Sequence, residues 1–321
     1  MKLWYASVNY GLEQAAGKIL KSCGATDIKI TESALTFSCP AEIKTKCINN
    51  LFLVLSVYSG KSIVDVAAII SGGLFPFPKI SGKTFRIIVM DCGKLRSIAP
   101  NIMNKMEKNI ARQTGLCINR AKPDLEIWLN RRSDGSVYFM LRTQKHPSFD
   151  KTLKKGELRA DIAEVMLREA NAGKDSVIAD LFGGWGAIAV AAAESGQYRK
   201  IYSGDIKDEC VKYQQKRLRG KRDCIVQKWD ARKLLLKDRS VDCIVTDPPW
   251  GEFEEIDRQH FYDEFAGEAG RILRQNGSLV FLTSAVNEAE AALGKHGFSH
   301  SHITLKVGGK TAFMFIATGT A

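Results

Sequence analysis

A carboxylate, two prolines and an indole follow one another in the segment Thr246-Asp-Pro-Pro-Trp-Gly251, directly after the apolar run 241–246. Two successive prolines fix the backbone and remove two N–H donors, so the neighbouring carbonyl groups are rigidly aimed. A carboxylate accepts hydrogen bonds without donating any, and together with the Pro248 carbonyl it can take both hydrogens of a planar exocyclic amino group. The Trp250 indole offers a flat face on which the base that bears this amino group can stack. The candidate catalytic residues are therefore Asp247, Pro248, Pro249 and Trp250.

A second cluster reads Asp180-Leu-Phe-Gly-Gly-Trp-Gly186 and lies between a predicted strand at 176–180 and a predicted helix at 187–194. Its glycines let the backbone approach a ligand, and the start of a helix offers unpaired N–H groups. Asp205, at the end of the next strand, is placed to accept from ribose hydroxyls. Asp230, after the third strand, can accept from an adenine amino group. The predicted nucleoside-cofactor residues are Asp180, Phe182, Gly183, Gly184, Gly186, Asp205, Ile206, Asp230, Ala231 and Asp247.

The elements that must position these residues are strands alternating with helices, from about residue 157 onward. Alternation at this spacing predicts a parallel sheet that is covered on both faces. A Gly308-Gly309 turn between two β-rich runs predicts a final hairpin that adds an antiparallel strand. The predicted strands are 176–180, 200–204, 223–227, 241–246, 277–283, 302–307 and 311–318, and the predicted helices are 157–171, 187–194, 207–219, 261–273 and 287–296.

The first half has a different pattern, typical of a small α+β region followed by a basic one. Strands at 3–8 and 28–37 are expected around a helix at 11–23. Further on, the sequence predicts a buried strand near 51–57 and a helix near 63–70, then a strand at 84–92 and an amphipathic helix at 98–114. Strands at 125–129 and 136–142 are expected to pair across a basic turn that contains Gly135. The polar, lysine-rich stretch 145–156 predicts a linker.

The positive charge of the chain is concentrated in this first half. Residues 1–160 contain 25 Lys and Arg against 12 Asp and Glu, a net charge of +13, whereas residues 161–321 contain 22 against 23. A surplus of this size favours a polyanionic partner, so we expect nucleic-acid binding in the first half. The candidate RNA-binding residues are Lys105, Lys108 and Arg112 at helical spacing, and Arg131 and Arg132 at a hairpin tip.

Several other classes of protein are disfavoured by the composition. No apolar run reaches the roughly 18 residues of a membrane span, and the N-terminal residues lack the apolar core of a signal peptide. The eight cysteines include no C-x-x-C pair and the five histidines form no ligand cluster, so no metal site is predicted. Scattered cysteines of this kind are expected in a reducing, cytoplasmic compartment.

The two strand-end motifs resemble a known family. Asp-Pro-Pro-aromatic after the fourth strand, with Asp-x-Phe-x-Gly-x-Gly after the first, is similar to the amino-methylating S-adenosylmethionine-dependent methyltransferases. The stretch Lys122–Asn130 and its hairpin resemble a THUMP domain, so most of the chain is similar to THUMP-containing tRNA guanine-N2-methyltransferases. Trp185 stands where that family usually has serine, and Trp250 where it usually has Tyr or Phe.

This resemblance implies an α/β fold that ends in a Rossmann-like, seven-stranded methyltransferase domain closed by an antiparallel hairpin. The expected parts are a ferredoxin-like α+β unit at 1–60, a THUMP-like RNA-binding domain at 61–145, a linker at 146–156 and the methyltransferase domain at 157–321. The implied cofactor is S-adenosylmethionine and the implied partner is RNA, specifically tRNA. No oligomer is predicted, so a monomer is the default.

The implied reaction is methylation of a guanine N2 amino group in tRNA, and three alternatives remain open. The Asp-Pro-Pro-Trp motif suits adenine N6 equally well, and the substrate can instead be a guanine of ribosomal RNA. A non-catalytic RNA-binding protein with a degenerate cofactor pocket is the alternative from another class. A nicotinamide-dependent oxidoreductase is disfavoured because the glycine loop departs from G-x-G-x-x-G.

Overall fold

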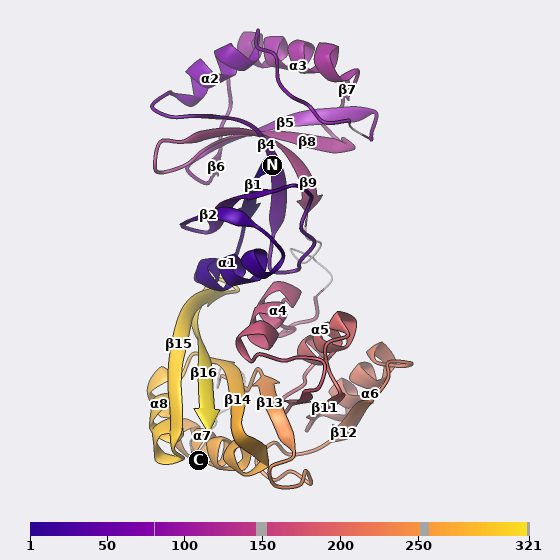
Figure 1. The fold of residues 1–321 in the computed structure, drawn as a ribbon, viewed down its shortest axis with the longest axis vertical. Helices are drawn as coiled ribbons and strands as arrows, with labels where there is room; N and C mark the ends of the chain where they lie inside the picture. Colours follow the sequence, from indigo (N-terminus) through magenta and orange to yellow (C-terminus); the bar gives the residue numbers. More distant parts are fainter. Residues whose placement is uncertain (80, 146–152, 251–256, 320–321) are drawn as a thin grey trace. The chain divides into compact units, whose positions relative to one another are not determined.

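Two β-sheets organise the chain in the computed structural model, which describes residues 1–321 except 80, 146–152, 251–256 and 320–321 (Figure 1). Two compact units correspond to these sheets. The first unit comprises Met1–Ser7, Leu20–Lys44 and Ile48–His146, and the second comprises Val8–Ile19, Thr45–Cys47 and Pro147–Ala321. Among the described residues, no helix is both long and apolar enough to cross a membrane.

The sheet of the first unit has nine strands within the described residues, in the order β2-β3-β1-β4-β9-β8-β5-β6, with β7 paired to β5. It runs without a break through both predicted N-terminal domains, because β4 pairs with β1 on one side and with β9 on the other. The boundary expected at residue 60 stays a prediction. The elements of residues 1–145, of which α1 belongs mostly to the second unit, are β1 (Lys2–Ser7), α1 (Glu13–Ser22), β2 (Thr26–Thr31), β3 (Ala34–Cys39), β4 (Asn50–Tyr58), α2 (Ile63–Ile70), β5 (Thr84–Asp91), β6 (Lys94–Leu95), α3 (Pro100–Thr114), β7 (Cys117–Ile118), β8 (Leu125–Arg131) and β9 (Val137–Lys145).

Local signals explain where the helices of this unit begin and end. Ser62 caps α2 and exchanges hydrogen bonds with Asp65 in a capping box. Pro100 stands at the start of α3, and Gly115 ends it in the left-handed conformation at φ 73°. The single strand expected at 28–37 was wrong: the chain turns at Ser33, where φ is 56°, and makes the β2–β3 hairpin. The outer strand β2 is mostly exposed, so burial constrains its sequence little.

The sheet of the second unit has seven strands in the described part of the chain, in the order β12-β11-β10-β13-β14-β16-β15. The five strands β12, β11, β10, β13 and β14 are parallel, and β16 pairs antiparallel to both β14 and β15. The antiparallel strand is confirmed, but it lies between β14 and β15 and not at the sheet edge. The elements are α4 (Ala160–Glu169), β10 (Val177–Asp180), α5 (Ala187–Ser195), β11 (Lys200–Asp205), α6 (Asp208–Arg217), β12 (Cys224–Lys228), β13 (Val241–Thr246), α7 (Arg258–Ile272), β14 (Leu273–Thr283), α8 (Val286–Lys295), β15 (Phe298–Val307) and β16 (Lys310–Gly319).

Helices cover both faces of this second sheet. On one face, strand residues such as Ala179, Ile244 and Phe281 join a buried cluster with the apolar sides of α7 and α8. Side chains alternate across a strand, so Cys243 and Ser278 point to the other face, where both contact the carbonyl of Ala170 at the end of α4. All the strands and helices predicted from residue 157 onward are present, with ends shifted by a few residues.

Candidate functional site

Three aspartates gather at one edge of the second sheet. Asp180 ends β10, Asp205 ends β11, and Asp247 directly follows β13. These three strands are parallel neighbours, so their carboxyl ends meet at the same edge, where open α/β sheets bind ligands. The charges of Asp205 and Asp247 both raise the pKa of Asp180, which reflects how near the three carboxyl groups are. The structure thus brings together the two motifs predicted from the sequence.

The Thr246 hydroxyl links these two motifs. Its Oγ1 donates to Oδ1 of Asp180 at 2.9 Å and accepts from the backbone N–H of Phe182, also at 2.9 Å. A hydroxyl can donate and accept at the same time. Thr246 is buried, so neither bond competes with solvent. Thr246, the residue before the Asp-Pro-Pro-Trp segment, therefore fixes the start of the glycine loop that follows the neighbouring strand β10.

Asp180 is buried with an incomplete set of partners. Only 1% of the residue is exposed, and its Oδ2 has no hydrogen-bond partner among the described residues. Burial is the main reason that its pKa rises to about 8, and the hydrogen bond from Thr246 lowers it against that trend. A buried carboxyl group in a cluster of acids fits a ligand with positive charge, since such a charge lowers the cost of ionising it. S-adenosylmethionine carries a sulfonium and an ammonium group, so the residues present fit this cofactor.

Two glycines of the loop 183–186, Gly183 and Gly186, have no room for a side chain beside Gln214 of α6. A Cβ on Gly183 would lie 2.6 Å from Oγ of Ser203 and 2.7 Å from the amide atoms of Gln214. Gly184 donates its N–H to Oδ2 of Asp205 at 2.9 Å, and Gly186 has φ 83°. Positive φ and close packing of this kind favour glycine. The loop therefore ties β10 to the end of β11 through backbone groups.

Trp185, the bulky residue of this loop, packs against α6 and the segment before α4. Its Nε1 donates to the carbonyl of Lys155 at 3.1 Å, and its ring meets Tyr213 edge to face at 5.4 Å. The ammonium of Lys154 lies 4.2 Å from the centre of the Trp185 ring, and Arg217 donates to the Trp185 carbonyl. Trp185 is therefore held by contacts with α6 and with the segment before α4.

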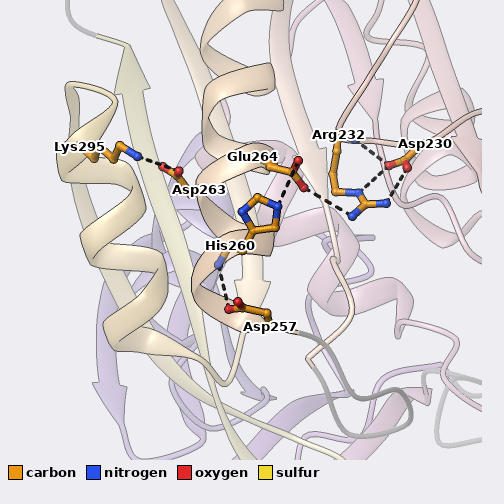
Figure 2. Close-up of polar contacts among 7 residues, drawn as sticks. All are labelled: Asp230, Arg232, Asp257, His260, Asp263, Glu264 and Lys295. Carbon is orange, nitrogen blue, oxygen red and sulfur yellow. Dashed lines mark hydrogen bonds and ion pairs between the residues drawn. The ribbon is translucent and has the colours of Figure 1, made fainter.

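The predicted adenine-side residues differ in their surroundings. Figure 2 shows the Arg232 guanidinium beside the Asp230 carboxylate; Nε donates to Oδ1 at 3.0 Å and Nη2 donates to Oδ2 at 2.7 Å. This contact lowers the pKa of Asp230. Arg232 also reaches Glu264 on α7. The two oxygens keep further lone pairs for an amino group, now in a fixed orientation. Ile206 is 58% exposed, which suits a residue that covers a flat ligand, whereas Ala231 is buried.

Asp247 and Trp250 contact each other, which the sequence did not predict. Nε1 of Trp250 donates to Oδ1 of Asp247 at 3.0 Å. Burial raises the pKa of Asp247 to about 7, although this hydrogen bond lowers it. Pro248 is buried and Pro249 is exposed, while Gly251, the last residue of the segment, lies outside the described residues. This hydrogen bond uses the edge of the indole and not its face, so stacking of a base on Trp250 stays a prediction.

The remaining predicted residues fall elsewhere. Phe182 turns its ring toward α7, where its centre lies 5.6 Å from those of both Phe261 and Phe265. In the first unit, Lys105, Lys108 and Arg112 share the exposed side of α3, whereas the hairpin arginines are engaged by the protein. Arg131 pairs with Asp91 at 2.7 Å, and Arg132 donates to the Glu32 carbonyl.

Two residues that hold the site were missed by sequence reasoning. Gln214 is fully buried, donates to the Gly184 carbonyl at 3.0 Å and accepts from Ser203 at 2.6 Å. The available signal was a polar residue in the apolar stripe of α6, midway between Cys210 and Leu218. Trp229 donates to the Leu181 carbonyl at 2.9 Å, and nothing in its sequence neighbourhood pointed to this bond.

Comparison with known proteins gives a family match. The model of the UPF0020 family, described as the RMKL-like methyltransferase domain, matches residues 147–311. Among curated proteins, the tRNA (guanine(6)-N2)-methyltransferase of Thermus thermophilus is 27% identical over 225 residues, which cover 65% of this chain. The match spans 64% of that relative's own length.

Solved structures share the fold over nearly the full chain. TrmN from Thermus thermophilus superimposes with a TM-score of 0.82 at 19% identity, covering 99% of this chain and 100% of that one. SMU.472, which was solved in complex with SAH, gives a TM-score of 0.76 at 14% identity, covering 100% and 98% of the two chains. Both likenesses confirm the predicted α/β architecture with a Rossmann-like second unit.

Substitution of Gly183 tests the tight packing of the glycine loop. We expect Gly183→Ala to lower the free energy of unfolding by about 1–3 kcal/mol, because the added methyl group must displace Ser203 or Gln214. Chemical denaturation monitored by circular dichroism measures this change. Gly173→Ala is the matched control, since a Cβ there meets nothing within 4 Å. Equal stability of the two variants would contradict the packing argument.

Asp180 also predicts a pH dependence of stability. Its native pKa of about 8 exceeds the ordinary value of 3.8, so between these pH values the folded protein keeps a proton that the unfolded chain releases. Stability of the ligand-free protein therefore falls as the pH rises from about 4 to about 8. Asp180→Asn removes this contribution. The melting temperature of the variant minus that of the wild type should therefore increase as the pH rises from about 4 to about 8. A constant difference between the two melting curves would show that Asp180 does not titrate this way.

Proposed function

The chain belongs to the UPF0020 family of RMKL-like methyltransferase domains, and from this membership we propose that it transfers a methyl group from S-adenosylmethionine to the exocyclic N2 of a guanine in tRNA. The observation that carries the proposal is the joining, through Thr246, of the glycine loop after β10 to Asp247 after β13. The glycine loop, which we propose for cofactor binding, is thereby linked to a carboxyl group that can accept hydrogen bonds from an amino group.

The protein's task in this reaction is alignment and charge stabilisation. The cofactor supplies an already activated methyl group on its sulfonium sulfur. Asp180, Asp205 and Asp230, with the tight turns of the glycine loop, would hold the amino-acid, ribose and adenine parts of the cofactor. Because the donor is activated, most of the acceleration comes from holding the acceptor nitrogen in line with the methyl carbon.

Asp247 would act on the acceptor amino group. The nitrogen of guanine N2 is a poor nucleophile, since its lone pair is delocalised into the ring. Hydrogen bonds from this amino group to Asp247 and to the Pro248 carbonyl would favour a pyramidal nitrogen and stabilise its developing positive charge. Trp250, which already donates to Oδ1 of Asp247, leaves Oδ2 for the substrate. Asp247 can also accept the proton that the methylated amine releases.

The choice of tRNA rests on the relatives and on the charge of the first half. The curated relative is named as a tRNA guanine-N2-methyltransferase, and residues 1–160 carry a net charge of +13. The exposed side of α3, with Lys105, Lys108 and Arg112, is the part of that charge we propose for phosphate contact. Arg131 and Arg132 are weaker candidates, because each already has a partner within the protein.

Methylation assays test the proposed substrate directly. Purified protein with labelled cofactor should modify tRNA, and mass spectrometry of the digested nucleosides should find N2-methylguanosine. Asp247→Ala should retain cofactor binding by calorimetry and lose turnover by about 100-fold or more, because it removes one acceptor for the reacting amino group. Near-normal turnover by this variant would refute the role of Asp247. Label in duplex DNA or as N6-methyladenosine would instead support the adenine alternative.

The raised pKa of Asp247 predicts the pH profile of the reaction. Only the ionised carboxyl group accepts both from Trp250 and from the substrate amine, and its pKa is about 7. We therefore expect kcat/KM to rise with pH through about 7, since this parameter reports the free enzyme. Asp247→Asn cannot ionise, so its low activity should lose this step. An unchanged step in that variant would assign it to another group.

A further inference from the structure

The near-neutral charge of residues 161–321 conceals one strongly basic helix. Residues 207–222, which contain α6 and the turn after it, hold seven Lys and Arg against two Asp and Glu, a net charge of +5. The rest of 161–321 then has 15 Lys and Arg against 21 Asp and Glu, a net charge of −6. Such separation of charge within one unit points to a local anion-binding surface.

The cations of this helix are exposed and share one side. Lys212 and Lys216 stand four residues apart, which places them on one face of α6, and Arg219 and Lys221 follow in the turn after the helix. We call these four residues the α6 basic face. All four are exposed, and in the part of the chain that the structure describes, Lys216, Arg219 and Lys221 form no ion pair. Lys212 lies near Asp208, whose pKa it lowers slightly.

The opposite side of α6 is fixed to the glycine loop. Gln214 bonds the Gly184 carbonyl, Arg217 bonds the Trp185 carbonyl at 2.8 Å, and Tyr213 packs on the Trp185 ring. Arg217 is therefore engaged inward and does not belong to the basic face. The outward lysines stand on a helix that three contacts hold to the cofactor loop. A ligand on this face would be held at a defined distance from the reaction site.

We propose that the α6 basic face binds the phosphate backbone of the RNA substrate, as a second contact surface beside that of the first unit. The inference rests on the proposed function, which supplies a polyanion that must reach this unit. Two lysines of α6 and two cations of the turn after it outnumber the two acids in the first turn of that helix, so they can contact neighbouring phosphates, and binding there releases counterions. Phosphate contacts position an RNA without reading its sequence, so this face would orient the substrate and leave base choice to the reaction site.

The salt dependence of RNA binding tests this surface. The variant K212E/K216E/R219E should bind tRNA about tenfold or more weakly at 0.15 M salt. Its slope of log K against log salt should be shallower by about two, since each phosphate contact contributes about 0.7 to 0.9. The milder K212Q/K216Q/R219Q variant should shift both quantities in the same direction and guards against misfolding of the reversed helix. Calorimetry should give unchanged cofactor affinity for both variants.

The matched control is K174E/K237E/R239E, which reverses two lysines and one arginine that are exposed on the same unit outside α6. It makes the same change in net charge, so an effect of bulk charge alone would weaken RNA binding equally in both triple variants. Equal slopes of log K against log salt in the α6 variants and the control would overturn the proposal. Unchanged tRNA affinity in all three variants would overturn it as well. If the wild type methylates guanine N2 while the slopes are equal, only this inference fails. If the wild type methylates no RNA, the proposed function fails.

Discussion

The Thr246 hydroxyl is the contact on which the arrangement of the site depends. It satisfies a carboxyl oxygen of Asp180 and the N–H of Phe182 at once, and it stands one residue before Asp247. Loss of either bond would leave a buried polar group without a partner, which costs about 1–3 kcal/mol. The last residue of β13 therefore joins the glycine loop to the start of the Asp-Pro-Pro-Trp segment. Both motifs can vary around it only while this hydroxyl keeps its two partners.

The sequence predicted the second unit well, because its signals were redundant. Apolar runs, glycine turns and acids at strand ends all favoured the same order of strands, and β13 was predicted to the residue. Alternation of strands and helices also has few solutions, since parallel strands need crossover helices. The three acidic strand ends at Asp180, Asp205 and Asp247 could be placed at one edge for the same reason. The first half offered fewer independent signals, and the exposed strand β2 was predicted as one strand together with β3.

The partners of individual side chains could not be predicted from the sequence. The bond from Gln214 to Gly184, the packing of Trp185 on Tyr213 and the bond from Trp250 to Asp247 depend on side-chain directions that no spacing rule sets. The place of β16 in the sheet could not be predicted either. A Gly-Gly turn predicts a hairpin, but it does not say which of the two hairpin strands pairs with β14. Motifs therefore located the site, and tertiary contacts decided how each residue serves it.

Charge separates two physical tasks within the second unit. Burial raises the pKa of both Asp180 and Asp247, and the charges of Asp205 and Asp247 raise that of Asp180 as well. Further acids near these carboxyl groups would make their ionisation still less favourable. Exposed cations on α6 point away from the glycine loop, while Gln214, a neutral residue, is the one that reaches it. The proposed phosphate-binding face and the contacts to the glycine loop thus lie on different sides of one helix. The near-neutral total of this half is the sum of +5 on residues 207–222 and −6 on the rest of 161–321.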